Sequence, residues 1–321
     1  MSTTLSEPST SSQNSSTKTS GSFSEQLRQT MLAIRLSFTW FGVRKTLSVA
    51  QRTKAAESFG ASHTFVSAGK KLLDTREPTF RAVTTVRNTA VRFLKHASLP
   101  FPESGIRLIR RPDLQRITES LEGFQLELNS AVSELDAEFD AMKAAARDRF
   151  GDLYSPSDYP ASLSPQFTMA WDFPSVEPPS YLRQLSPELY QQETARVRAR
   201  FDEAVRLAEA AFTEELASMV DHLADRLSGT DDGRPKTFRD SAVENLQEFF
   251  QRFQSLNIGS NEQLDELVQQ SQAILNGVGP QELRGSAGLR QQITTQLSAV
   301  QNSLDGLMVD RPRRNIQRRP R

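Results

Sequence analysis

The sequence contains no cysteine among its 321 residues. A disulfide framework, a thiol nucleophile and a thiolate-bound metal are therefore excluded. Their absence fits a reducing compartment, and we expect a cytoplasmic protein.

Histidine is almost as scarce. The three histidines, His63, His96 and His222, lie on different predicted elements and show no ligand spacing. A zinc site needs three or four converging ligands. The sequence also lacks the G-x-S-x-G elbow of serine hydrolases. We therefore expect no catalytic residues, no metal and no cofactor.

Long apolar runs are missing as well. The nearest candidate, residues 31–43, is short, contains Arg35 and follows thirty mostly polar residues. A membrane helix needs about 18–20 apolar residues, and a signal peptide places its apolar region near the start. No membrane interaction is expected.

A phosphate-binding loop is only suggested by "FVSAGKKLLD" at residues 65–74. The P-loop pattern requires a glycine where Thr64 stands and a Ser or Thr where Lys71 stands. The segment is better interpreted as a strand end and turn, with Leu72 and Leu73 packing inward.

The zero net charge conceals a strong asymmetry. Residues 1–112 hold 17 Lys and Arg against 6 Asp and Glu, a balance of +11. Residues 113–309 hold 16 against 32, a balance of −16, and residues 310–321 hold 6 against 1, a balance of +5. Either the two large parts face each other or water, or a basic surface meets a polyanion.

The C-terminal tail carries the densest positive charge, and we expect residues 310–321 to be disordered. Its arginines are Arg311, Arg313, Arg314, Arg318, Arg319 and Arg321. Guanidinium groups pair with phosphates in a planar, bidentate way, so the tail is a candidate nucleic-acid-binding segment. It could equally be a solubilising tail or a partner of the acidic helices.

Two segments alternate as strands do. Leu32, Ile34, Leu36, Phe38 and Trp40 would share one face, and so would Phe167, Met169, Trp171 and Phe173. We expect the two strands to pair in a small sheet that contains both tryptophans. A further short strand is predicted at residues 63–68.

Two long helices are predicted. Residues 113–150 show apolar steps of three and four throughout, with a coiled-coil-like seam, and Ser186-Pro187 starts a second such helix that ends near residue 228. We expect them to form an antiparallel hairpin that presents an extended surface to a partner. The carboxylates of Glu134, Asp136, Glu138 and Asp140 are interpreted as a solvated face.

Shorter helices are predicted at residues 47–59, 78–96, 238–256, 261–276 and 280–308. Capping boxes start two of them, at Thr237/Asp240 and at Ser260/Gln263.

The predicted fold is mainly α (α+β). Residues 1–24, of which 15 are Ser or Thr, are expected to be disordered. Residues 25–236 would hold the sheet and the helical hairpin, and residues 237–309 a helical bundle.

Several segments together resemble a family of bacterial and phage proteins known as domain of unknown function thirty-one-fifty. They are the strand around Trp40, "GKKLLD", "LPFPESGIRLI", "RFGDLY", "DYP", "FRDSAVENL" and "LNIGSNEQLDEL". The resemblance covers roughly residues 30–300 and brings no catalytic residues. Both termini lie outside it.

The resemblance implies a phage or mobile-element protein that works beside a MoxR-type AAA+ ATPase. We therefore expect a non-enzymatic protein–protein interaction component, or adaptor, in the cytoplasm of a bacterial or phage-infected cell. The alternative is a nucleic-acid-associated protein that uses the arginine-rich tail and the basic N-terminal half. The sequence leaves the oligomeric state open.

Overall fold

The computed structural model describes residues 15–228 and 240–309, and the fold is mainly α-helical with a small antiparallel sheet, as predicted. The described residues form two compact units. Unit 1 contains those within 1–33, 98–110 and 175–321, and unit 2 contains 34–97 and 111–174. The expected boundary at residue 236 falls inside unit 1, where helices on both sides of that position pack together.

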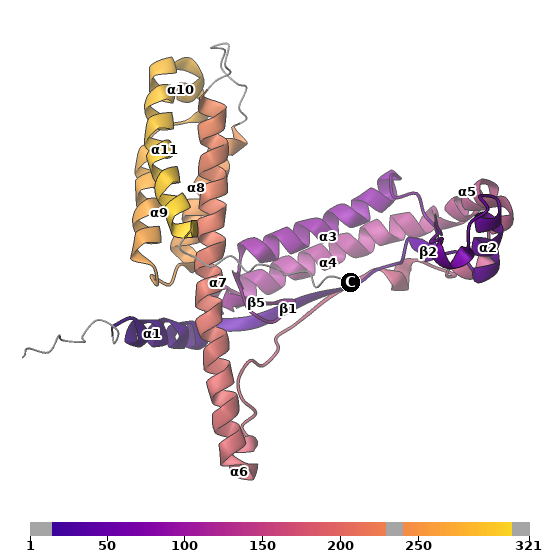
Figure 1. The fold of residues 1–321 in the computed structure, drawn as a ribbon, viewed down its shortest axis with the longest axis horizontal. Helices are drawn as coiled ribbons and strands as arrows, with labels where there is room; N and C mark the ends of the chain where they lie inside the picture. Colours follow the sequence, from indigo (N-terminus) through magenta and orange to yellow (C-terminus); the bar gives the residue numbers. More distant parts are fainter. Residues whose placement is uncertain (1–14, 229–239, 310–321) are drawn as a thin grey trace, which may run out of the picture. The chain divides into compact units, whose positions relative to one another are not determined.

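Helix α7 (Pro187–Leu227) is the axis of unit 1. Ser186 caps it by accepting a hydrogen bond from the backbone N–H of Leu189, and Pro187 occupies the first turn, as predicted. The helices of unit 1 around it are α1 (Ser15–Thr30), α6 (Leu182–Leu185), α8 (Ser241–Leu256), α9 (Glu262–Leu275), α10 (Pro280–Gly285) and α11 (Ala287–Val309). Figure 1 shows α8 to α11 gathered beside the C-terminal half of α7, with α6 at its opposite end.

The apolar seam of α7 forms the core of unit 1. Its buried members include Val197, Phe201, Val205, Ala208, Phe212, Leu216, Leu223 and Leu227. They pack with apolar side chains of α8, α9 and α11 in one continuous cluster. The seam predicted from the sequence is therefore buried within the chain, rather than presented as an extended surface.

Helix α1 corrects the expectation of a disordered head. Residues 15–24 belong to this helix, while residues 1–14 lie outside the described part of the chain. The helix packs on α7 and buries Leu27 completely. The Ser/Thr-rich helix cannot bury enough apolar surface by itself, and packing on α7 supplies that burial.

The caps of the shorter helices differ in detail from the prediction. Asn261, not Ser260, caps α9 by accepting from the N–H of Leu264, and the Ser260 hydroxyl binds the Glu209 carboxylate. The last predicted helix, residues 280–308, is interrupted at Ser286, which follows Gly285. The predicted cap at Thr237 lies outside the described residues.

Unit 2 is built on α3 (Pro78–His96), which packs along α4 (Leu114–Ala137). The helix α5 (Phe139–Phe150) follows after a break at Glu138, so the predicted single helix is wrong at this point. Neither glycine nor proline causes the break. It occurs where Asp136 and Glu138 bind other segments: Glu138 accepts a hydrogen bond from the Thr79 hydroxyl.

The predicted pairing of the tryptophan strands is confirmed. Strand β1 (Met31–Thr39) runs antiparallel to β6 (Thr168–Asp172), with Leu36 opposite Trp171. Trp40 lies one residue beyond β1, and its ring meets Phe167 edge-on at 4.8 Å. The guanidinium of Arg87 lies 4.9 Å from the Trp40 ring centroid, a cation–π contact.

Two short strand pairs were not anticipated. In unit 1, β4 (Leu99–Pro100) pairs with β5 (Ile106–Arg110). In unit 2, β2 (Arg44–Thr46) pairs with β3 (Gly69–Lys71). The strand predicted at 63–68 is therefore displaced to 69–71, and a single helical turn, η1 (His63–Phe65), precedes it.

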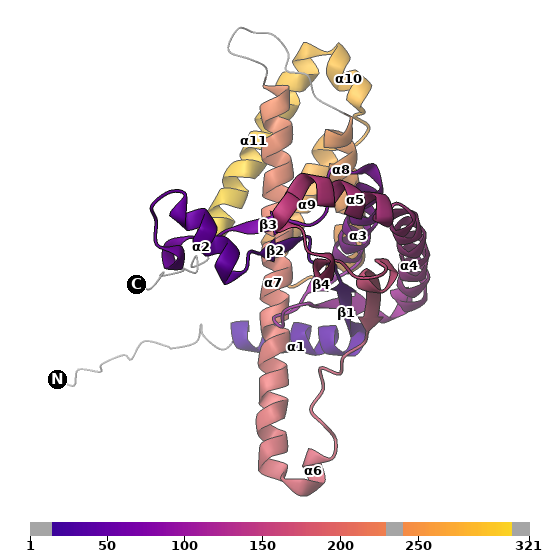
Figure 2. The same cartoon turned by 90° about the vertical axis from the view of Figure 1, so that its right-hand side faces the viewer.

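The predicted helix at 47–59 is present as α2 (Val49–Glu57), with a capping box between Ser48 and Gln51. Figure 2 turns the view so that this end of unit 2 faces the reader, with α2 beside the strands β2 and β3. The remaining single turns are η2 (Arg111–Asp113), η3 (Gly151–Leu153), η4 (Pro156–Asp158) and η5 (Ser164–Gln166).

The two long helices, which we expected to form an antiparallel hairpin, lie in different units. Helix α4 belongs to unit 2, where α3 covers its apolar side, and α7 belongs to unit 1, where α11 makes its most extensive helix contact. Each long helix therefore buries its apolar seam against a neighbouring helix of its own unit.

Candidate functional site

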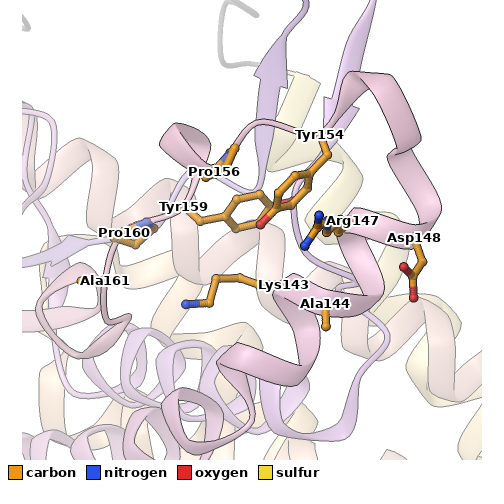
Figure 3. Close-up of a pocket in the computed structure, with 9 residues that line it drawn as sticks. All are labelled: Lys143, Ala144, Arg147, Asp148, Tyr154, Pro156, Tyr159, Pro160 and Ala161. Carbon is orange, nitrogen blue, oxygen red and sulfur yellow. The ribbon is translucent and has the colours of Figure 1, made fainter.

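A cleft in unit 2 lies between α5 and the segment that follows it (Figure 3). Its volume is about 690 Å³, which falls within the usual range of ligand pockets. The lining residues are Lys143, Ala144, Arg147, Asp148, Tyr154, Pro156, Tyr159, Pro160 and Ala161. One wall is helical, and the other contains aromatic and proline residues.

The helical wall carries positive charge. Lys143 and Arg147 are four residues apart and therefore share one face of α5. The Lys143 ammonium lies 4.7 Å from the centroid of the Phe139 ring and 2.6 Å from an Asp140 carboxylate oxygen. Figure 3 shows Arg147 beside the tyrosine rings, whereas Asp148 points away from them.

The opposite wall is a tyrosine pair. The rings of Tyr154 and Tyr159 stack with centroids 5.5 Å apart and planes 25° apart. The Tyr159 hydroxyl donates a hydrogen bond to the Leu72 carbonyl at 3.2 Å. Burial raises the pKa of Tyr159, and neighbouring Tyr154 and Asp158 raise it further. Tyr159 therefore remains protonated and fixed in place.

A buried ionic cluster holds this wall against the β2–β3 strand pair. The Asp158 carboxylate lies 2.5 Å from the Lys45 ammonium and also pairs with Lys70, which donates to the Leu153 carbonyl. Burial acts to raise the pKa of Asp158, but hydrogen bonds from both lysines outweigh it and the pKa is lowered. Asp158 is therefore charged at neutral pH and compensated.

Asp136 fixes the far end of the same segment. One carboxylate oxygen accepts the N–H of Leu163 at 2.6 Å, and the other accepts the Ser162 hydroxyl at 2.7 Å. The interpretation of the helix carboxylates as a solvated face is therefore wrong for Asp136. Glu134 and Asp140 are exposed, in keeping with it.

The residues singled out from the sequence do not form one site. His63, His96 and His222 are exposed on η1, α3 and α7. Within residues 15–228 and 240–309, no cluster of three potential metal ligands occurs. Leu72 and Leu73 are buried beside the glycine-lysine pair, as expected. The six tail arginines from Arg311 to Arg321 lie outside the described residues.

The cleft residues were missed by the sequence analysis because no periodicity marks them. Tyr154 and Tyr159 come from an irregular segment, and Lys143 and Arg147 look like ordinary exposed charges on a helix. The short pieces "RFGDLY" and "DYP" were the available signal, since they combine Gly, Pro and Tyr at the end of a long helix.

Unit 1 contains a second hollow, of about 490 Å³, between α8 and α9. It is lined by Gln247, Phe250, Gln251, Gln254, Gln269, Gln272, Ala273, Leu275, Asn276 and Gly277. Every one of these side chains is neutral. The groove can therefore exchange amide hydrogen bonds, but it offers no charge for an ionic ligand.

In the part of the chain that the structure describes, no helix combines the length and apolar character required to cross a bilayer. No family model, curated protein or solved structure matches the chain.

Proposed function

We propose that this chain is a non-enzymatic protein-interaction component, or adaptor, that binds a segment of a partner protein in the cleft of unit 2. The observation that carries the proposal is the composition of the cleft: stacked tyrosines on one wall and two cations on the other. Tyrosine and arginine are, with tryptophan, the side chains enriched at binding hot spots. An acidic segment with an aromatic or proline residue fits both walls.

The chemistry of the lining favours binding over catalysis. The Tyr159 hydroxyl is already engaged with a backbone carbonyl, and its pKa is raised rather than lowered. Asp148, the carboxylate of the lining, points away from the tyrosine rings (Figure 3). General acid–base catalysis needs a group whose pKa lies near the working pH and whose reactive atom faces the substrate.

The buried seams of α4 and α7 weaken the idea that the long helices present an extended apolar stripe. Three exposed apolar side chains do remain where α6 meets α7: Tyr181, Leu185 and Leu189. They offer a second contact surface, and the cleft is the more specific of the two because it combines charge with shape.

The resemblance described above supplies the partner class. We propose a MoxR-type AAA+ ATPase or a protein that such an ATPase acts on, encoded by a phage or mobile element. The positive wall of the cleft favours a partner segment that carries carboxylates, because Arg147 offers a planar pair of donors for one.

The double substitution Arg147→Glu and Tyr154→Ala is expected to reduce the recovery of a protein partner about tenfold or more, as loss of a hot spot does. The measurement is affinity purification of the tagged full-length chain from its native host, with nuclease, read by mass spectrometry. Arg81→Glu, an exposed charge reversal on α3 outside the cleft, is the matched control. Equal recovery with all three proteins would remove the cleft from the interface.

Nucleic-acid binding is the second candidate function, and the six arginines of the tail favour it. Replacing all six with glutamine in the full-length chain is expected to abolish most salt-dependent affinity for DNA or RNA. The slope of log affinity against log salt should fall by about 0.7–0.9 for each phosphate that the tail no longer neutralises. Fluorescence anisotropy at several salt concentrations measures it, and an unchanged slope would contradict a role for the tail.

A further inference from the structure

The β2–β3 strand pair carries an unusual arrangement of charge. Arg44 is directly opposite Lys71, and Lys45 is directly opposite Lys70. Like charges facing each other across two strands destabilise the pairing. Four of the six residues in this strand pair are basic, so the arrangement requires compensation from elsewhere.

Only one of these two cross-strand pairs, Lys45 and Lys70, has its charge compensated by a carboxylate. Lys45 and Lys70 share the carboxylate of Asp158. Arg44 and Lys71 are exposed, and among the described residues neither forms an ion pair with a carboxylate. The carboxylate that interacts with Lys71, Asp74, already binds Arg76 through both oxygens.

The chain between the two strands adds two exposed aromatic rings. Phe59 is 87% exposed and Phe65 is 92% exposed, so the described residues leave nearly all of both rings uncovered. Residues 44–71 contain six Lys and Arg and a single acidic residue, Glu57, a balance of +5. Exposed aromatic surface and uncompensated positive charge thus occur together in residues 44–71 of unit 2, the β2–β3 segment.

The β2–β3 segment is held in shape by its own hydrogen bonds. The N–H of Ala61 and that of Phe59 both donate to the Ala56 carbonyl, and the N–H of Phe65 donates to the Ser62 carbonyl. Gly60 makes the turn with φ of +63°, a conformation that side-chain-bearing residues rarely adopt. The phenylalanines are therefore displayed by a structured loop.

We propose that the β2–β3 segment, residues 44–71, binds single-stranded nucleic acid. Arg44 and Lys71 contact phosphates, and the rings of Phe59 and Phe65 stack on bases. A single strand matches both features, since it offers phosphates and unpaired base faces together. A duplex offers phosphates and base edges but no free base faces, because its bases are stacked on each other. The proposal rests on the second candidate function and gives it a site separate from the tail.

The test uses fluorescence anisotropy with a labelled oligo(dT) of about 16 nucleotides, within the site sizes of single-strand-binding folds. The full-length chain with its six tail arginines replaced by glutamine is the parent protein. Adding Arg44→Glu and Lys71→Glu to it is expected to weaken binding at least tenfold and to reduce the salt slope by about 0.7 for each phosphate no longer bound. Arg81→Glu with Arg92→Glu is the matched control, since both are exposed on α3.

Phe59→Ala and Phe65→Ala separate stacking from charge. Each is expected to weaken oligo(dT) binding about fivefold to a hundredfold while leaving the salt slope unchanged. Equal affinity for a duplex of the same length, or for poly-glutamate with no effect of the phenylalanine variants, would overturn the proposal in favour of a general anion surface. If the parent protein has already lost all binding, the tail alone binds nucleic acid and the site on the strand pair is refuted. If the parent binds as tightly as the wild type, the tail hypothesis fails, and the strand-pair site stands only if Arg44→Glu and Lys71→Glu weaken that binding; no effect of these two substitutions would refute it.

Discussion

Asp158→Asn is expected to destabilise unit 2 by about 3 kcal/mol, the lower end of the range for removing one partner of a buried ion pair. The substitution leaves the Lys70 ammonium buried without a counter-charge, because its side chain is only 6% exposed. The lower end applies because Lys45, the second lysine of the cluster, is half exposed and can be hydrated. The measurement is denaturant unfolding followed by tryptophan fluorescence, since Trp40 and Trp171 both lie in unit 2.

The same variant should change how stability depends on pH. The pKa of Asp158 is lowered in the folded protein, so its carboxylate stabilises the fold fully at any pH above its unfolded-state pKa of about 4. This stabilisation is lost as the pH falls through the pKa of the folded protein. The difference in unfolding free energy between the wild type and the variant should therefore be constant near neutrality and shrink below about pH 4.

Asp152→Asn is the control, because Asp152 is exposed on η3 and takes no part in the buried cluster around Asp158. It removes the same charge and is expected to change stability by less than about 0.5 kcal/mol. A comparable loss of stability in both variants would mean that the net charge of the segment matters, and not the buried cluster.

Leu216→Ala is expected to destabilise unit 1 by about 3–5 kcal/mol. Leu216 is fully buried in the seam of α7, within the cluster that α8, α9 and α11 complete. The alanine removes apolar side-chain atoms from a close-packed core and leaves a cavity that the surrounding helices cannot fill. Far-UV circular dichroism follows this change, because unit 1 contributes most of the long helices.

Leu185→Ala is the matched control for that experiment. The substitution is chemically identical, but Leu185 is 76% exposed on α6. It is expected to change the free energy of unfolding by less than about 0.5 kcal/mol. Equal effects of the two leucine substitutions would show that α7 is not packed as the core of unit 1.

The helix starts and strand faces could be predicted because their causes are local. Ser186 and Pro187 start α7 through a side-chain cap and a preset backbone angle, and both act within one turn. The two strands around Leu36 and Trp171 could each be predicted from alternation, because successive side chains of a strand point to opposite faces whatever surrounds it.

The cleft could not be predicted, because its parts are brought together by distant contacts. Tyr159 is fixed by the Leu72 carbonyl, 87 residues away, and Asp158 is neutralised by Lys45 and Lys70. The sequence offers Lys70 only as half of a failed phosphate-loop pattern. Its role as a buried counter-ion depends on which carboxylate the fold places beside it.

The sequence by itself determined the class of fold, the positions of most helices, the alternating faces of the two tryptophan strands and the uneven distribution of charge. These follow from apolar periodicity, capping chemistry and composition, which act over a few residues. Only the tertiary structure decided which seams pack together, where the long helix predicted at residues 113–150 breaks between α4 and α5, and which charges are compensated. An apolar stripe specifies that it must be buried but not by which partner, so α4 packs on α3 and α7 on α11.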